Sequence, residues 1–167
     1  MLAIHFNVLE RCNFVSQRKN NMQRILITGG AGFIGSAVIQ ELLGGGYDVT
    51  VVDDFSFGNE AFLPATGISL HRLDILDRAG LAQVFEQERP DFVVHLAAIH
   101  FIPYCNAHPF ESANINIQGT KNVLELAAQH EVNKVFFAST AAVYPIIDDP
   151  ISETHPTGPL DIYGLSK

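Results

Sequence analysis

Tyr163 and Lys167, near the end of the chain, are spaced so that they could act together on a proton. On a helix, residues four positions apart lie on the same face. A free phenol is a poor base at neutral pH because it titrates near ~10, but a neighbouring ammonium group favours the phenolate. The phenolate can take a proton from a hydroxyl while a hydride leaves the carbon that bears it. The pair therefore predicts acid–base catalysis of an oxidation.

Such a reaction also needs a hydroxyl side chain that holds the substrate oxygen and relays its proton. Thr140 directly follows a predicted strand and is the first candidate, with its neighbour Ser139 as the alternative. A Tyr-x-x-x-Lys spacing alone is common and is more typical of a solvated helix face. The order along the chain favours chemistry, because a glycine-rich turn comes first, then the Ser-Thr pair, and then Tyr163 and Lys167.

Residues 25–35 predict a site for a dinucleotide. A short apolar run ends in a glycine cluster that contains Gly30-x-Gly32-x-x-Gly35 and, overlapping it, Gly29-x-x-Gly32-x-x-Gly35. Such glycines allow a tight turn, close approach of a diphosphate to the backbone and close helix–strand packing. The helix that follows directs its free N–H groups and its positive dipole end at the phosphates. The alternative interpretation is a plain glycine-rich turn without a ligand.

Asp53 supports the dinucleotide interpretation. It ends an apolar run at residues 49–52, about 20 residues beyond the glycines, where an acidic side chain can accept hydrogen bonds from ribose hydroxyls. The same carboxylate would repel a 2′-phosphate, so the sequence favours NAD over NADP. The alternative is a turn residue after a strand, which is the reading that we prefer for Asp54.

Alternation of strand and helix patterns predicts an α/β fold with a doubly wound parallel sheet of the Rossmann type. Ligands in such sheets bind beyond the carboxyl ends of the strands, where the candidate residues lie. Asp77 is a plausible N-cap, the segment with Pro103 and Pro109 is expected to be a loop, and His95 is expected to be a core residue. The predicted strands are 24–28, 49–52, 68–73, 92–96 and 135–138, and the predicted helices are 32–43, 78–88 and 111–130.

Composition narrows the classes of function. The chain has 167 residues, 47% of them hydrophobic, which suits one domain with a real core. A net charge of −8 without a Lys/Arg block argues against a nucleic-acid partner. Two cysteines and scattered histidines, without metal-type spacing, indicate a reducing compartment and no metal site. No apolar run approaches the ~18 residues that span a membrane, so we expect a cytoplasmic protein. Residues 1–21 are predicted to be a poorly ordered extension, and the folded unit to cover residues 22–167.

The sequence resembles the extended short-chain dehydrogenase/reductases, specifically the NAD-dependent nucleotide-sugar epimerase/dehydratase family. Seven motifs in family order carry the resemblance over residues 22–167. They are TGGAGFIG (28–35), VVDD (51–54), LDILD (73–77), VVHLAA (93–98), NINIQGT (114–120), STAAVY (139–144) and YGLSK (163–167).

The resemblance implies NAD as cofactor and a role for each matching position. The catalytic trio would be Thr140, Tyr163 and Lys167, and Asn116 resembles the helix asparagine that supports the active site. His100 is a further candidate contact for the substrate. The implied cofactor-binding residues are Gly29, Gly32, Phe33, Ile34, Gly35, Asp53, Asp74, Ile75, Leu96, Ala97, Ala98, Asn116, Tyr163 and Lys167.

Two departures from the family pattern shape the expected function. Ala141 and Ala142 stand where related dehydratases carry an acidic pair, which favours an epimerase acting on a nucleotide-sugar. The chain is also shorter than family members, so we expect an incomplete sheet that lacks the substrate domain. A reductase, decarboxylase, dehydrogenase or dehydratase remains an alternative, as does a non-catalytic NAD-binding module. The resemblance also allows a homodimer through helix 111–130 and the helix that starts near Tyr163.

Overall fold

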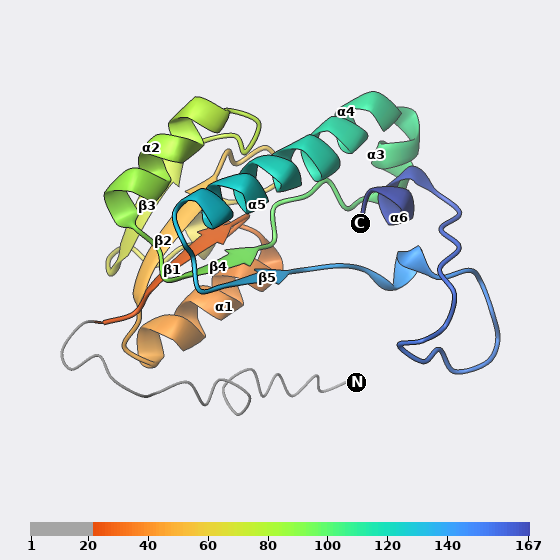
Figure 1. Cartoon of the computed structure of the whole chain (residues 1–167), viewed down its shortest axis with the longest axis horizontal. Coiled ribbons are helices and arrows are strands. Elements are labelled where there is room, and N and C mark those ends of the chain that lie inside the picture. Colours follow the sequence, from red (N-terminus) through yellow and green to blue (C-terminus); the bar gives the residue numbers. More distant parts are fainter. Residues whose placement is uncertain (1–21) are drawn as a thin grey trace.

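Five parallel strands form one sheet in the order β3-β2-β1-β4-β5 (Figure 1). The computed structural model describes residues 22–167, so the predicted extension at 1–21 lies outside the described residues. The strand order reverses between β1 and β4, which is where ligands bind in doubly wound sheets. The strands are β1 (Arg24–Thr28), β2 (Asp48–Asp53), β3 (Ile68–Arg72), β4 (Phe92–His95) and β5 (Lys134–Phe137).

Helices cover both faces of the sheet, as the fold class predicted. Helix α1 (Phe33–Gly44) lies on one face, and α2 (Arg78–Glu88) and α5 (Thr120–Gln129) lie together on the other (Figure 1). Successive strand side chains point to opposite faces. In β1, Ile25 and Ile27 therefore pack toward α1, whereas Leu26 packs into the core beneath α2 and α5.

The segment 101–110 corrects one prediction, because it is helical and was expected to be a loop. It contains α3 (Ile102–Ala107) and the start of α4 (Pro109–Ala113), and each helix has a proline in its first turn. Proline is favoured there, because the N–H that it lacks would have no partner within the helix. The predicted helix 111–130 is present as α4, a π-helical segment (Asn114–Gly119) and α5.

Two further elements complete the described chain. Helix α6 (Ile162–Ser166) contains Tyr163 of the predicted site and packs against α3 and α4. Short 3₁₀ turns occur at Glu60–Phe62 and Ala141–Val143. In residues 22–167, no helix has both the length and the apolar character needed to cross a bilayer.

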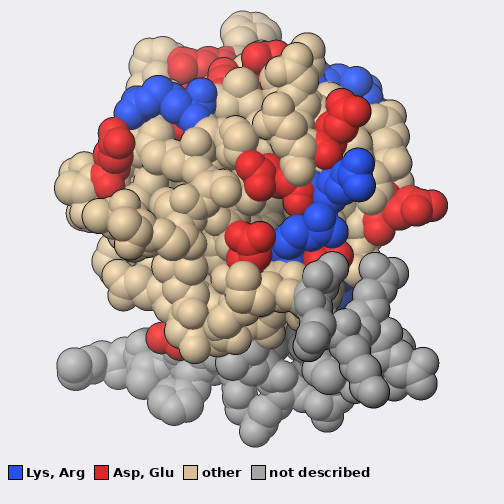
Figure 2. All heavy atoms as spheres, turned by 90° about the vertical axis from the view of Figure 1, so that its left-hand side faces the viewer, with Lys and Arg blue, Asp and Glu red and all other residues tan. Residues whose placement is uncertain are grey.

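Charges on the face in Figure 2 are mixed, with Lys and Arg side chains close to Asp and Glu side chains. Ion pairs on the described surface include Arg72 with Glu60 at 2.8 Å and Arg24 with Asp91 at 3.5 Å. Exposed pairs of this kind contribute little to stability, so the two hydrophobic layers hold the sheet together.

Replacing Asp77 by Ala should lower the free energy of unfolding by about 1 kcal/mol. Asp77 is the N-cap of α2, as predicted, and its Oδ1 accepts a hydrogen bond from the backbone N–H of Gly80 at 3.0 Å. Urea unfolding measures the loss. Glu86→Ala is the matched control, since Glu86 is exposed on the same helix and its loss should change stability by less than about 0.5 kcal/mol. Equal effects of the two substitutions would contradict the capping role.

Candidate active site

A cavity of about 500 Å³ opens at the carboxyl ends of the strands, beside the reversal of strand order. All of the predicted site residues except Thr140 and Asn116 line it, although they come from distant parts of the sequence. Their predicted roles in binding and catalysis stay predictions. The lining residues among them are Gly29, Gly32, Phe33, Ile34, Gly35, Asp53, Asp74, Ile75, Leu96, Ala97, Ala98, Tyr163 and Lys167.

The turn after β1 has room only for glycine at two positions. Gly29 adopts a φ of +73°, and a Cβ atom there would lie 2.6 Å from the backbone nitrogen of Ala97. A Cβ atom at Gly35 would lie 2.5 Å from the carbonyl oxygen of Gly29. The first turn of α1 therefore packs directly on the end of β1, and the backbone itself forms the floor of the pocket.

The N-terminus of α1 is open toward the pocket. No side chain in the described part of the chain caps it, and its N-cap residue is Gly32. Phe33 and Ile34, which begin α1, are 86% and 60% exposed and line the pocket. Free N–H groups at a helix N-terminus, combined with a glycine turn, suit a diphosphate.

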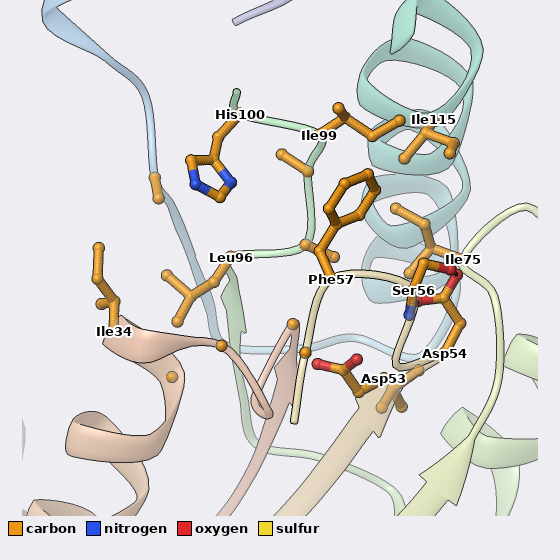
Figure 3. A pocket seen from close by; sticks show the side chains of 18 of the residues that line it. Ile34, Asp53, Asp54, Ser56, Phe57, Ile75, Leu96, Ile99, His100 and Ile115 are labelled. Atoms are coloured by element: carbon orange, nitrogen blue, oxygen red, sulfur yellow. Dashed lines mark hydrogen bonds between the residues drawn. The ribbon is translucent and has the colours of Figure 1, made fainter. Parts of the chain in front are cut away.

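Asp53 joins the glycine turn to the loop after β2. Its Oδ2 accepts a hydrogen bond from Ala31 N–H and its Oδ1 accepts one from Phe55 N–H, each at 2.8 Å. Phe55 has a φ of +63°, so this loop holds a sparsely populated conformation beside the site. The carboxylate points into the pocket (Figure 3), where its remaining lone pairs can accept hydrogen bonds from hydroxyl groups. Asp54 behaves as the predicted turn residue, because its carboxylate accepts from Ser56 N–H at 2.9 Å.

Arg72 is adjacent to Asp53 in the sheet register but is engaged elsewhere. Its guanidinium lies 4.0 Å from the centre of the Phe55 ring and donates to Glu60 at 2.8 Å. An arginine near this acidic position accommodates the 2′-phosphate in proteins that bind NADP. Here the only cation beside Asp53 in the described sheet register is already paired.

Asp74 and Ile75 form the wall of the pocket beyond β3. The Asp74 Oδ1 accepts a hydrogen bond from Leu76 N–H at 2.8 Å, which fixes this turn. Ile75 is 5% exposed and packs against Gly119 of the π-helical segment, where a Cβ atom would lie 2.4 Å from the Ile75 Cδ1. This wall is apolar with a carboxylate at its edge, which suits a heteroaromatic ring.

Phe57 lines the pocket and was not predicted from the sequence, and neither was its contact with Tyr104. Phe57 comes from the loop after β2, and its ring lies above Asp53 near Ile99 and Ile115 (Figure 3). Tyr104 comes from α3 and meets that ring edge-on, with the centroids 5.4 Å apart. An aromatic residue inside a glycine-containing loop directly after Asp53 was the available signal. The pair connects the loop after β2 to α3.

Lys167 is the cation at the other end of the pocket. Its Nζ lies 4.4 Å from the centre of the Phe137 ring, and burial lowers its pKa from 10.5 to about 8. Tyr163 lines the same end, as does Ser139, whose hydroxyl donates to the Lys167 carbonyl oxygen at 3.5 Å. A phenol, an ammonium and a hydroxyl therefore face one cavity.

Thr140 is placed differently from the other predicted residues. Its Oγ1 accepts a hydrogen bond from Ala142 N–H at 3.2 Å and caps the 3₁₀ turn Ala141–Val143. Its neighbour Ser139, the alternative in the sequence analysis, lines the pocket. The geometry therefore favours Ser139 as the hydroxyl nearest the cavity, while the role of Thr140 stays a prediction.

Asn116 lies outside the pocket lining and is hydrogen-bonded to residues on two sides of it. It is 1% exposed, its Oδ1 accepts from Ile99 N–H at 2.8 Å, and its Nδ2 donates to the Ile99 carbonyl oxygen at 3.0 Å. The same Nδ2 donates to Ser166 Oγ at 2.9 Å. The amide thus holds the segment after β4 against the helix that carries Tyr163.

The two histidines of the β4 region separate as expected. His95 is fully buried, and both ring nitrogens have hydrogen-bond partners, which confirms the prediction of a core residue. His100 is exposed and lies at the rim of the pocket (Figure 3), so its predicted contact with a substrate stays open to test.

A parallel sheet that reverses its order beside a glycine turn, with an acid at the end of β2, defines a dinucleotide-binding domain of the Rossmann type. The chain belongs to the NAD dependent epimerase/dehydratase family, whose sequence model matches residues 25–167.

Known relatives agree with this family. A UDP-glucose 4-epimerase 4 of Oryza sativa is 37% identical over 86% of this chain and 42% of its own length. The UDP-glucose 4-epimerase of Thermus thermophilus, solved in complex with NAD, superposes with a TM-score of 0.83 at 35% identity, over 87% of this chain and 47% of its own. The Thermotoga maritima UDP-glucose 4-epimerase, solved with UDP-glucose, gives a TM-score of 0.83 at 34% identity, over 87% and 48%. The chain spans less than half the length of each of these relatives.

Proposed function

We propose that this chain binds NAD and carries the cofactor site and the catalytic Tyr-Lys pair of a nucleotide-sugar epimerase. One observation carries the proposal: a single pocket is lined by the glycine turn, Asp53, Tyr163 and Lys167. The uncapped start of α1 and the turn that a Cβ atom would fill suit a diphosphate. The relatives named as UDP-glucose 4-epimerases indicate a UDP-sugar as the substrate class.

Each residue in or beside the pocket is assigned a role in this proposed reaction. Tyr163 takes the proton from a sugar hydroxyl as the alcohol becomes a ketone, and it returns the proton after the ketosugar has turned over. Ser139 or Thr140 holds the sugar oxygen. When bound, NAD would supply the acceptor for the hydride and, once reduced, the donor that returns it. Ala141 and Ala142 offer no acid or base beside Thr140, so this site favours epimerisation over elimination of water.

Lys167 sets a pH limit on this chemistry. Its pKa of about 8 means that the amine is charged below pH 8 and neutral above it. Only the charged form presents a cation at the end of the pocket that Tyr163 lines. We therefore expect turnover that depends on this pair to decline as the pH rises through about 8.

NAD is favoured over NADP because of the charges around the ribose position. The buried carboxylate of Asp53 would repel a 2′-phosphate, and Arg72 is held by Glu60 and by the ring of Phe55. On the described strand next to Asp53, Arg72 would have to leave its present partners before it could pair with a 2′-phosphate.

Titration calorimetry with NAD and NADP on the 167-residue chain tests the proposal. We expect NAD to bind at least about ten-fold more tightly than NADP. The substitution Asp53→Asn should reduce this ratio of affinities, because it removes the negative charge. A folded chain that gives no heat with NAD, or that prefers NADP, would contradict the proposal. A parallel assay with UDP-glucose separates the functions: binding without formation of its 4-epimer supports a non-catalytic module.

Exposed apolar side chains on the π-helical segment, α5 and α6 bear on assembly. Ile117, Leu124 and Leu165 are 53%, 44% and 67% exposed, although they are large and apolar. We propose that these side chains take part in the contact of the homodimer that the family resemblance allows. Light scattering gives the mass in solution, and a monomer at high micromolar concentration would contradict it.

A further inference from the structure

A continuous series of hydrogen bonds crosses the interior from β1 to α5 through His95. His95 ends β4 and has no exposed surface. Its Nδ1 lies 2.6 Å from Thr28 Oγ1, and its Nε2 lies 2.8 Å from Thr120 Oγ1. Thr28 directly precedes Gly29 of the glycine turn, so the series begins at the floor of the pocket.

The donor and acceptor roles in this series follow from counting protons. The Thr120 hydroxyl donates its single proton to the carbonyl oxygen of Asn116 at 2.6 Å, so it can only accept from His95. Nε2 of His95 must therefore carry the proton, and Nδ1 must be the acceptor. The Thr28 hydroxyl then donates to Nδ1, while it accepts from Ala97 N–H at 3.4 Å.

The series continues from Asn116 to the helix with the candidate catalytic pair. The Asn116 amide donates to Ser166 Oγ at 2.9 Å, and that hydroxyl donates to the Tyr163 carbonyl oxygen at 2.8 Å. Each hydroxyl in the path donates once and accepts at least once. The glycine turn and the backbone of Tyr163 are thus joined by a series of buried and partly buried hydrogen bonds that passes through His95 and Asn116.

We infer that neutral His95, protonated on Nε2, is a positioning residue that fixes the glycine turn relative to the Tyr163–Lys167 helix. The inference rests on the proposed function, since it concerns how a bound dinucleotide meets the Tyr-Lys pair. A charged imidazole would direct a second proton at Thr28 and reverse that hydrogen bond. It would also add a second cation in the interior, where the charge of Lys167 already acts on the ring.

The surroundings keep the ring neutral. Burial, and after it the charge of Lys167, lowers the pKa of His95 from 6.5 to about 4. Phe137 of β5 stacks on the ring with centroids 5.8 Å apart, and Thr28 and Thr120 are uncharged. Between pH 6.5 and 4 the unfolded chain binds a proton that the folded chain resists. Stability is therefore fully present above pH 6.5 and falls as the pH drops toward 4.

Nitrogen-15 NMR of the histidine rings in the 167-residue chain tests the protonation state. We expect the His95 signals to show a proton on Nε2 only and to stay constant from pH 8 down to about pH 5, because the pKa is about 4. A proton on Nδ1, or a titration near 6.5, would overturn the assignment. This outcome does not depend on NAD, so it separates a failure of the inference from a failure of the proposed function.

Substitutions test the positioning role. His95→Gln keeps a donor toward Thr120 but cannot reach both threonines, and His95→Leu removes both contacts. The matched control is Val93→Ala, which creates a cavity at a buried position of the same strand outside the series. At a temperature where all variants are folded, we expect His95→Gln and His95→Leu to weaken NAD binding about ten-fold or more, and Val93→Ala to change it less than about two-fold.

The comparison distinguishes positioning from mere stability. All of these variants lower the midpoint of thermal unfolding, but only those at His95 should change NAD affinity. NAD binding by His95→Leu that equals binding by Val93→Ala would overturn the inference. Absence of NAD binding by the unsubstituted chain would instead reject the proposed function.

Discussion

Replacing Tyr163 by Phe should reduce turnover of a protein that carries this site and a substrate domain by about 10²- to 10⁴-fold. The substitution removes only the phenolic O–H, so the ring still lines the pocket beside Lys167. Without that group the described pocket lining offers no other phenol for this acid–base role, because Tyr163 is the only tyrosine in that lining. The turnover number and the dissociation constant for NAD should be measured together, because we expect the second to change little.

Tyr144→Phe is the control for this experiment. Tyr144 follows the Ala141–Val143 turn and packs edge-on against His155, outside the pocket lining. Its substitution should leave turnover within about two-fold, as expected for a site away from the chemistry. Retention of most turnover by Tyr163→Phe on every accepted sugar would show that another group moves the proton.

Gly29→Ala should remove NAD binding and destabilise the fold. The residue has a φ of +73°, and its Cβ atom would meet the Ala97 backbone at 2.6 Å, so neither the conformation nor the space admits a side chain. We expect the free energy of unfolding to fall by about 3 kcal/mol and the affinity for NAD to fall by about 100-fold or more. Chemical denaturation and calorimetry measure the two effects.

Gly44→Ala is the matched control for the glycine substitution. Gly44 ends α1, and a Cβ atom there would have no neighbour within 4 Å. Alanine should stabilise the helix by about 0.5–1 kcal/mol and leave NAD affinity unchanged. If Gly29→Ala behaved in the same way, the close approach of the turn to the segment after β4 would not matter for the site.

The elements with strong local signals were predictable from the sequence. The strands and helix 78–88 agree with the structure to within one or two residues, because apolar runs and caps such as Asp77 act locally. The pocket residues Gly29, Asp53 and Lys167 were found because strand ends in a parallel sheet meet at one edge.

Other features depend on direction and on distant contacts. Pro103 and Pro109 were interpreted as loop markers, but each lies in the first turn of a helix, which a proline permits as readily as a loop. The meeting of Phe57 with Tyr104 joins segments 47 residues apart (104 minus 57), and no spacing rule reports such a contact. Thr140 turns its hydroxyl to its own 3₁₀ turn, and spacing does not reveal which way a side chain points.

The hydrogen bonds from Ala31 and Phe55 to Asp53 are made by the chain's own backbone. Folding itself therefore ties both flanking loops to this carboxylate. The entropy lost in ordering them is therefore incurred when the chain folds, so association keeps more of its intrinsic free energy. Measured affinities of variants at this position will consequently combine a lost ligand contact with a loosened frame.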